Sequence, residues 1–126
     1  MSEKAIQNDI LLKYGALPEL RLSRFNTGKA YGYSIIKNLL NSIGESERLN
    51  RLPLTRYGQV GQADIMGIIR GSGRAIAIEV KKPGEVMDDD QIKWAKMFTK
   101  FGGLHILAYS PEEVGFILKR EGIILA

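Results

Sequence analysis

Cysteine is absent from the 126-residue sequence, and histidine occurs once, as His105. Without cysteine the chain has no disulfide bonds, no thiolate metal ligands and no thiol nucleophile. A single histidine also argues against an imidazole-rich zinc site, which commonly takes more than one. We therefore expect any bound metal to be a hard cation with oxygen ligands, namely Mg²⁺, with Mn²⁺ as a substitute.

Long apolar runs are missing as well. No apolar stretch reaches the roughly 18 residues that a membrane helix needs, and the segment Met1–Asp9 lacks the apolar stretch of a secretory signal. We therefore expect a cytoplasmic protein. The composition, 44% hydrophobic and 25% charged, is that of a globular domain. The length suits one domain, which we expect to span residues 1–126.

Negative charge is scarce in one part of the chain. The net charge is +4, and residues 21–56 carry seven basic side chains against two acidic ones. Such a segregated basic stretch can follow a phosphate backbone, and a solvated loop and helix surface is the alternative interpretation. The basic residues of this stretch are Arg21, Arg24, Lys29, Lys37, Arg48, Arg51 and Arg56.

Periodicity predicts an α/β domain with a central mixed sheet flanked by helices. Residues 2–14 have helical spacing, and residues 20–26 alternate like a strand. A turn-rich loop over 26–33 follows, then helix-like spacing over 33–49 that is broken at Gly44, and then a loop or irregular extended arm over 51–62. Two nearly apolar strands, 63–70 and 74–82, flank Gly71-Ser72-Gly73, which predicts a hairpin whose strands are covered on both faces. A helix over 89–101, a strand over 104–110 and a final helix with a capping box at Ser110 follow.

Three charged residues interrupt these apolar strands: Asp64, Glu79 and Lys81. Because side chains alternate along a strand, Glu79 and Lys81 share one face. A two-residue turn at Gly71-Ser72 would place Asp64 opposite Glu79, and a turn one residue later would place it opposite Lys81. Both registers bring the three charges to one face. A three-residue loop would instead oppose Asp64 and Val80 and would need a bulge.

Neighbouring carboxylates repel when both are ionised, so they share a proton or bind a cation. A divalent cation suits Asp64 and Glu79, and the carbonyl of Val80 could add an oxygen ligand. Such a cation would lower the pKa of a bound water and neutralise charge on a phosphate. Lys81 would position that water or stabilise the transition state. The alternative is a structural salt bridge of Lys81 with either acid.

Polar residues on two helices could complete this site. Gln91 lies in line with an apolar stripe that includes Trp94, so its amide should point toward the sheet, although a half-exposed capping glutamine is equally compatible. Glu3 could bring a third carboxylate to the metal. We assign the run Asp88-Asp89-Asp90 to helix capping, and we expect His105 to be packed in its strand.

The ordered set Glu3, Gly61-Gln62-Ala63-Asp64, Glu79-Val80-Lys81 and Gln91 resembles the VRR-NUC (virus-type replication-repair nuclease) branch of the PD-(D/E)xK superfamily. The segment from Arg24 to Gly28 looks like that family's loop near the DNA-binding face. The resemblance covers most of the chain. One departure is Ala63, where many members have proline before the aspartate; this proline is no ligand.

The resemblance implies a restriction-endonuclease-like core in which Asp64 and Glu79 are metal ligands and Lys81 is the catalytic lysine, with Glu3 and Gln91 completing the site. It also implies a phage or bacterial homodimer that cuts branched DNA such as Holliday junctions. We expect DNA contacts from Arg21, Arg24, Asn26, Lys29, Arg56, Gln62 and Lys82. A nuclease for flaps, nicks or linear duplex and a non-catalytic DNA-binding module are the alternatives.

Overall fold

The computed structural model describes residues 1–25, 41–44 and 60–125. The chain divides into two units, residues 1–25 with 60–126 and residues 26–59, and each is considered by itself. In the second unit, the described residues 41–44 form a short helical end followed by a turn at Gly44. The helices and strands that carry the predicted acids belong to the first unit, and one domain over residues 1–126 stays a prediction.

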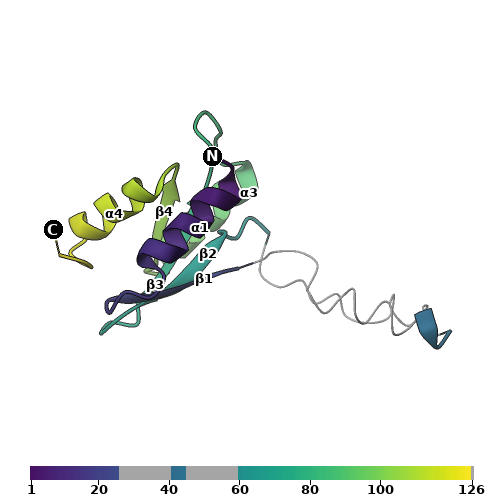
Figure 1. The fold of residues 1–126 in the computed structure, drawn as a ribbon, viewed down its shortest axis with the longest axis horizontal. Coiled ribbons are helices and arrows are strands. Elements are labelled where there is room, and N and C mark those ends of the chain that lie inside the picture. Colours follow the sequence, from purple (N-terminus) through teal and green to yellow (C-terminus); the bar gives the residue numbers. More distant parts are fainter. Residues whose placement is uncertain (26–40, 45–59, 126) are drawn as a thin grey trace. The chain divides into compact units, whose positions relative to one another are not determined.

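The first unit is a mixed four-stranded sheet with three helices, which confirms the predicted fold class (Figure 1). The strands lie in the order β1-β2-β3-β4; β1, β2 and β3 are antiparallel neighbours, and β4 is parallel to β3. The elements are α1 (Glu3–Tyr14), β1 (Leu20–Arg24), β2 (Ile65–Ile69), β3 (Ala75–Val80), α3 (Asp89–Lys100), β4 (Leu104–Ala108) and α4 (Pro111–Arg120).

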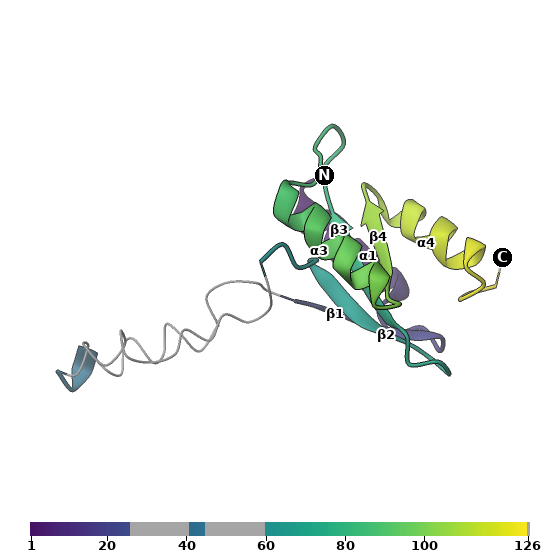
Figure 2. The same ribbon diagram turned by 180° about the vertical axis from the view of Figure 1, so that it is seen from behind.

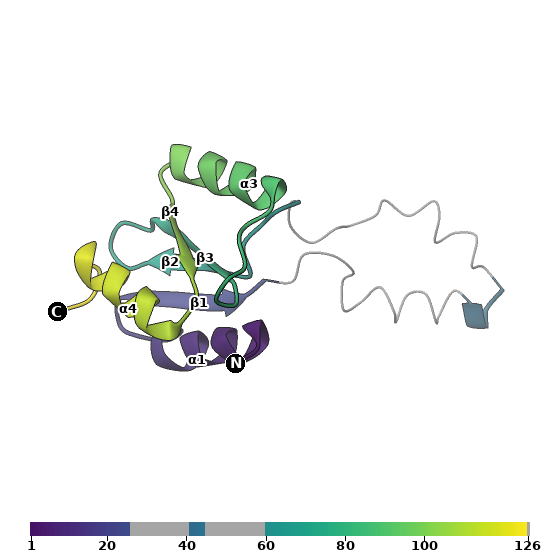
Figure 3. The same cartoon turned by 90° about the horizontal axis from the view of Figure 1, so that it is seen from above.

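The helices cover the two faces of the sheet unequally. Figure 3 shows α3 on one face and both α1 and α4 on the other. The α1 and α4 side holds the larger apolar core, built on isoleucines and leucines of the sheet and both helices. The α3 side holds a smaller cluster in which Trp94 stacks on Phe98 with ring centroids 4.8 Å apart. Two layers of helices around one sheet are the solution expected for strands with apolar residues on both faces.

Strand β3 is the central element because its two sets of alternating side chains enter different cores. Ile76, Ile78 and Val80 face α1 and α4, whereas Ala77 packs in the α3 cluster. Every residue from Ile76 to Val80 is buried. The small alanine leaves the α3 side of the strand less crowded, and Glu79 lies on that side.

The β2–β3 hairpin adopts the register in which Asp64 lies opposite Glu79, since Ile65 pairs with Ile78. The turn is longer than the predicted two residues. Ile69 donates its N–H to the carbonyl of Arg74 at 2.9 Å, and its own carbonyl accepts from Gly73, so the chain reverses over residues 70–73. The register is nevertheless one of the two predicted, because the longer turn adds an even number of residues.

Strand β2 is less covered than the sequence led us to expect. Its residues Ile65 and Ile69 are buried against the larger core, but Ile68, on the α3 side, is 57% exposed. A single helix covers that side of the sheet and leaves this part of β2 open. The expectation that both hairpin strands are covered on both faces therefore holds for β3 and is wrong for β2.

Serine residues cap the first and last helices, and the capping box predicted at Ser110 forms only in part. Ser2 caps α1 by accepting from the N–H of Ala5 at 3.1 Å, and the helix ends at Gly15. Ser110 caps α4, with its hydroxyl accepting from the N–H of Glu113. The carboxylate of Glu113, however, accepts from Tyr109 at 2.8 Å instead of returning to Ser110, so the predicted capping box is only half formed. Among residues 1–25, 41–44 and 60–125, the helices are too short or too polar to cross a membrane.

Gly61 ties the segment before Asp64 to the start of α3. Its φ is +80°, and a Cβ at this position would lie 2.2 Å from the carbonyl oxygen of Asp90. We expect Gly61→Ala to lower the free energy of unfolding by at least about 2 kcal/mol, since the left-handed conformation and the backbone clash add up. Urea unfolding measures this difference.

Gly71→Ala is the matched control, because Gly71 has φ +88° but no atom within 4 Å of the added Cβ. Gly71→Ala should lower the free energy of unfolding by only about 1 kcal/mol, the cost of the left-handed conformation. Equal losses in the two variants would contradict the close contact between Gly61 and α3.

Candidate active site

The two predicted acids lie side by side where β2 begins and β3 ends. Asp64 immediately precedes β2, and its Oδ2 accepts a hydrogen bond of 3.0 Å from the backbone N–H of Val80. Glu79 is the next-to-last residue of β3 and is 2% exposed. The register of the hairpin thus delivers both carboxylates to one place.

Gln91 connects Glu79 to the first turn of α3. Its side-chain carbonyl accepts from the N–H of Asp88 at 3.0 Å, and its amide nitrogen donates to Oε1 of Glu79 at 2.9 Å. The backbone N–H of Gln91 in turn donates to Asp88 at 2.8 Å, which completes a capping box. The sequence left open whether this glutamine faces the sheet or caps the helix, and it does both. Asp88 is the helix cap, as predicted.

The second oxygen of Glu79 is buried without a partner. Among the described residues, no group donates a hydrogen bond to Oε2 of Glu79. Burial, followed by the negative charge of Asp64 and a hydrogen bond with its side chain, raises the pKa of this carboxyl group to about 8, although the positive charge of Lys81 opposes the rise. An unpaired carboxylate oxygen beside a second acid is the environment that a divalent cation would stabilise. The two acids therefore fit a hard, oxygen-liking cation.

The number of acids close enough for direct ligation is small. Within residues 1–25, 41–44 and 60–125, no three acidic, histidine or cysteine side chains are grouped tightly enough to hold a metal ion together. A site with two protein carboxylates suits Mg²⁺, which commonly keeps several waters and takes substrate phosphate oxygens. The predicted roles of Glu3 and of the Val80 carbonyl as further ligands stay predictions.

Lys81 follows β3 directly, and its backbone N–H donates to the carbonyl of Ala108 at 3.1 Å. Its positive charge lowers the pKa of both Glu79 and Glu3, so its ammonium group lies near both acids. Yet the described part of the chain places no carboxylate oxygen within 4.0 Å of it. Within residues 1–25, 41–44 and 60–125, Lys81 therefore forms no salt bridge with Asp64 or Glu79, and its role as the catalytic lysine stays a prediction.

A second acidic pair, which the sequence did not reveal, adjoins this site. Burial raises the pKa of Glu3, and the negative charge of Glu85 and a hydrogen bond between the two carboxyl groups raise it further. Glu85 belongs to the loop between Lys81 and α3, where its backbone carbonyl accepts from the hydroxyl of Tyr109 at 2.9 Å. In Figure 2 this loop lies beside the N-terminus of α1. In the sequence, Pro83-Gly84 directly after Lys81 and Lys82 predicts a turn, and this turn could have indicated that the loop with Glu85 folds back toward the site.

Of the residues predicted to contact DNA, three have side chains that contact other protein groups, and a fourth, Lys82, is exposed. Arg24 donates from Nε to Gln7 at 3.0 Å and is also bonded to Asn8, both in α1. Arg21 is bonded to the backbone carbonyls of Leu17 and Leu20. The amide of Gln62 contacts the sulfur of Met66, and Lys82 is exposed. The remaining predicted contacts, Asn26, Lys29 and Arg56, lie outside the described residues.

Paired carboxylates, a lysine and a helix glutamine at one end of a mixed α/β sheet are the arrangement of PD-(D/E)xK-type nucleases. A family comparison supports this class, since the model of the VRR-NUC domain matches residues 2–111. The chain therefore belongs to the VRR-NUC family, and its domain is a nuclease domain. The match runs from the cap of α1 to the first residue of α4. Searches of curated proteins and of solved structures found no match.

The raised pKa of Glu79 predicts how the free energy of unfolding depends on pH. Its ordinary value is 4.5 and its folded value about 8, so the folded protein holds a proton that the unfolded chain releases. The resulting stability is complete below pH 4.5 and is lost as the pH rises toward 8. In EDTA, wild type should therefore lose up to about 1.4 kcal/mol per pH unit across this window relative to Glu79→Gln. Urea unfolding at several pH values measures the difference.

Glu112→Gln is the control, because Glu112 is exposed on α4 and its pKa is lowered, mainly by a backbone hydrogen bond. This variant should keep the pH dependence of wild type between pH 6 and 9. A constant difference between wild type and Glu79→Gln over that range would mean that Glu79 titrates normally.

The hydrogen bond from the Tyr109 hydroxyl predicts how well the loop that carries Glu85 is ordered. We expect Tyr109→Phe to accelerate amide hydrogen exchange in residues 82–87, because the variant lacks the donor to the Glu85 carbonyl. The loss of stability should be about 1 kcal/mol. Tyr14→Phe is the control, since the Tyr14 hydroxyl lies against Gly115 between α1 and α4. Unchanged exchange in Tyr109→Phe would show that this hydrogen bond does not order the loop.

Proposed function

We propose that this domain is a divalent-metal-dependent endonuclease that hydrolyses phosphodiester bonds of DNA at Asp64, Glu79 and Lys81. The observation that carries the proposal is the oxygen Oε2 of Glu79, which is buried beside a second acid and has no donor among the described residues. Leaving a carboxylate oxygen in this state is costly unless a proton or a cation occupies it. Such a costly arrangement is typical of functional sites, where a bound cation takes part in the chemistry.

Asp64 and Glu79 would hold the cation, which supplies a water of lowered pKa and neutralises charge on the phosphate. The Val80 N–H holds Oδ2 of Asp64 and the Gln91 amide holds Oε1 of Glu79, so both carboxyl groups have defined orientations. Lys81 orients the attacking water or stabilises the charge that develops on the phosphate oxygens. Overall, water adds its oxygen to phosphorus, the bond from phosphorus to the leaving oxygen breaks, and that oxygen takes a proton.

For the substrate we propose branched DNA of the Holliday-junction type, cut by a homodimer. The described residues of each chain hold one such site, and a two-fold symmetric junction needs two cuts, so a symmetric pair of chains suits it. Glu3 would complete the site beside Lys81, as the family resemblance implies. The contacts to DNA would come from Arg21, Arg24, Asn26, Lys29, Arg56, Gln62 and Lys82.

Cleavage assays on labelled linear duplex, flap and four-way junction test the proposal. With Mg²⁺, and also with Mn²⁺, the junction should be cut, and EDTA should abolish the reaction. Asp64→Asn, Glu79→Gln and Lys81→Met should each lower the single-turnover rate at least about 100-fold. Lys119→Met, an exposed lysine of α4, is the matched control and should cut like wild type. Circular dichroism checks that the variants fold.

The outcomes separate the alternatives. Cutting of flaps or linear duplex at the same rate as the junction would show a nuclease of broader substrate range. Binding of DNA without metal-dependent cutting would show a non-catalytic module. Wild-type rates for Glu79→Gln or Lys81→Met would place the chemistry elsewhere.

A further inference from the structure

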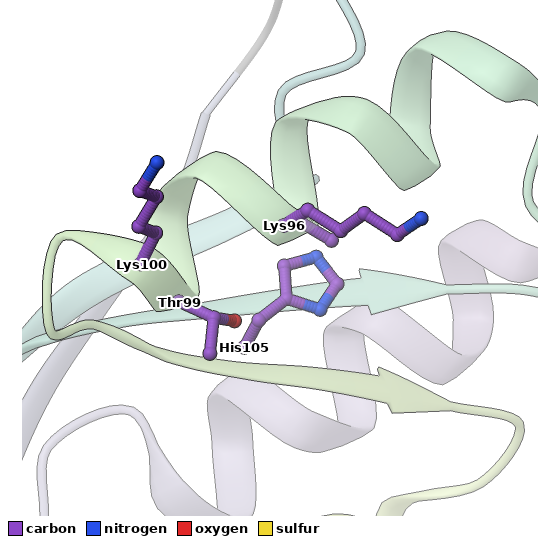
Figure 4. Close-up of a pocket in the computed structure, with 5 residues that line it drawn as sticks. Lys96, Thr99, Lys100 and His105 are labelled. Atoms are coloured by element: carbon purple, nitrogen blue, oxygen red, sulfur yellow. The ribbon is translucent and has the colours of Figure 1, made fainter.

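A shallow hollow lies between α3 and the edge strand β4, on elements that the proposed reaction does not use directly. Its volume is about 430 Å³, and it is lined by Ala95, Lys96, Thr99, Lys100 and His105. In Figure 4 the side chains of Lys96 and Thr99 flank the His105 ring, and Lys100 extends outward from the end of the helix. The lining carries two positive charges and no acid.

In the second half of this helix, Lys96 and Lys100 have no acidic residue three or four positions away. Lys93, Lys96 and Lys100 are exposed and are spaced three and four residues apart, so they are neighbours along one side of α3. Like charges at this spacing destabilise a helix by about 0.2–0.5 kcal/mol per pair. Lys100 interacts favourably with the C-terminal end of the helix, but Lys96 lies too far from that end to benefit fully. Within the described residues, neither Lys96 nor Lys100 forms an ion pair.

His105 adds a polar group to the floor of the hollow. Its ring centroid lies 6.0 Å from that of Trp94, and burial lowers its pKa, so the ring is mostly neutral at pH 7. A neutral imidazole has one N–H donor and one acceptor. Two ammonium groups, a hydroxyl and an imidazole around a shallow depression form a set of donors suited to phosphate oxygens.

We propose that this hollow binds a backbone phosphate of the DNA outside the cleavage site, with Lys96 and Lys100 as the charged contacts. The proposal rests on the proposed function, because it assumes a DNA substrate. Helix α3 links the two places: Gln91 in its first turn contacts Glu79, and Lys100 is its last residue. At about 1.5 Å per residue these positions are about 13 Å apart along the helix, the rise of about four base pairs of duplex.

Binding measurements over a range of salt concentrations test the proposal. Labelled junction DNA is titrated in EDTA, so that binding is measured without cutting, and the logarithm of affinity is plotted against that of NaCl concentration. We expect Lys96→Glu with Lys100→Glu to weaken binding at least about tenfold and to reduce the slope by about 1–2, since each lost phosphate contact removes about 0.9. Lys96→Arg with Lys100→Arg should keep the wild-type slope.

The control is Lys119→Glu with Arg120→Glu, which changes the net charge equally on exposed residues at the end of α4. It should leave the slope nearly unchanged. Single-turnover cutting at saturating protein should stay at the wild-type rate in Lys119→Glu with Arg120→Glu, because neither residue lies in the proposed cleavage site or in the hollow.

The results distinguish this proposal from the proposed function. An unchanged slope in the Lys96 and Lys100 variant, or an equal reduction in the α4 control, overturns the phosphate site whether or not the protein cuts DNA. A reduced slope specific to the α3 variant supports the site, even if no substrate is cut by wild type. In that last case the nuclease proposal fails and the hollow remains a DNA-binding site.

Discussion

The hydrogen bond from Gln91 to Glu79 joins the two parts of the molecule on which the site depends. On one side stands the first turn of α3, where Asp88 and Gln91 exchange hydrogen bonds and thereby fix the orientation of the Gln91 amide. On the other side stands a carboxyl group buried in the central strand. Since the amide oxygen is occupied by the cap, only its nitrogen can face Glu79. The capping hydrogen bond therefore orients the Gln91 amide so that its nitrogen donates to Glu79.

A buried carboxyl group is tolerated here because β3 divides its side chains between two cores of different size. The isoleucines on the α1 and α4 side provide the larger part of the apolar burial. On the α3 side, alanine leaves space, and a single helix covers the strand. The larger apolar core and the candidate site therefore lie on opposite faces of one strand. The cost of the unpaired Glu79 oxygen is carried by the apolar packing behind it.

Periodicity predicted the elements well because it reflects which residues face a core. It placed Asp64, Glu79 and Lys81 together because side-chain alternation fixes their face, although it left two registers open. It could not give the length of the 70–73 turn or the exposure of Ile68, which depend on how many helices cover each face. Glu85 was missed because loop residues have no period, and its place depends on Tyr109, which is distant in sequence. The roles of the site residues remain predictions.

The turn at residues 70–73 also limits how this hairpin can vary in length. Removing or adding one residue there would shift one strand against the other by a single position and send Asp64 to the opposite side of the sheet from Glu79. Changes by two residues would keep both acids on the same side. The hairpin therefore accommodates a change of turn length with its two acids still together only when that change preserves the register.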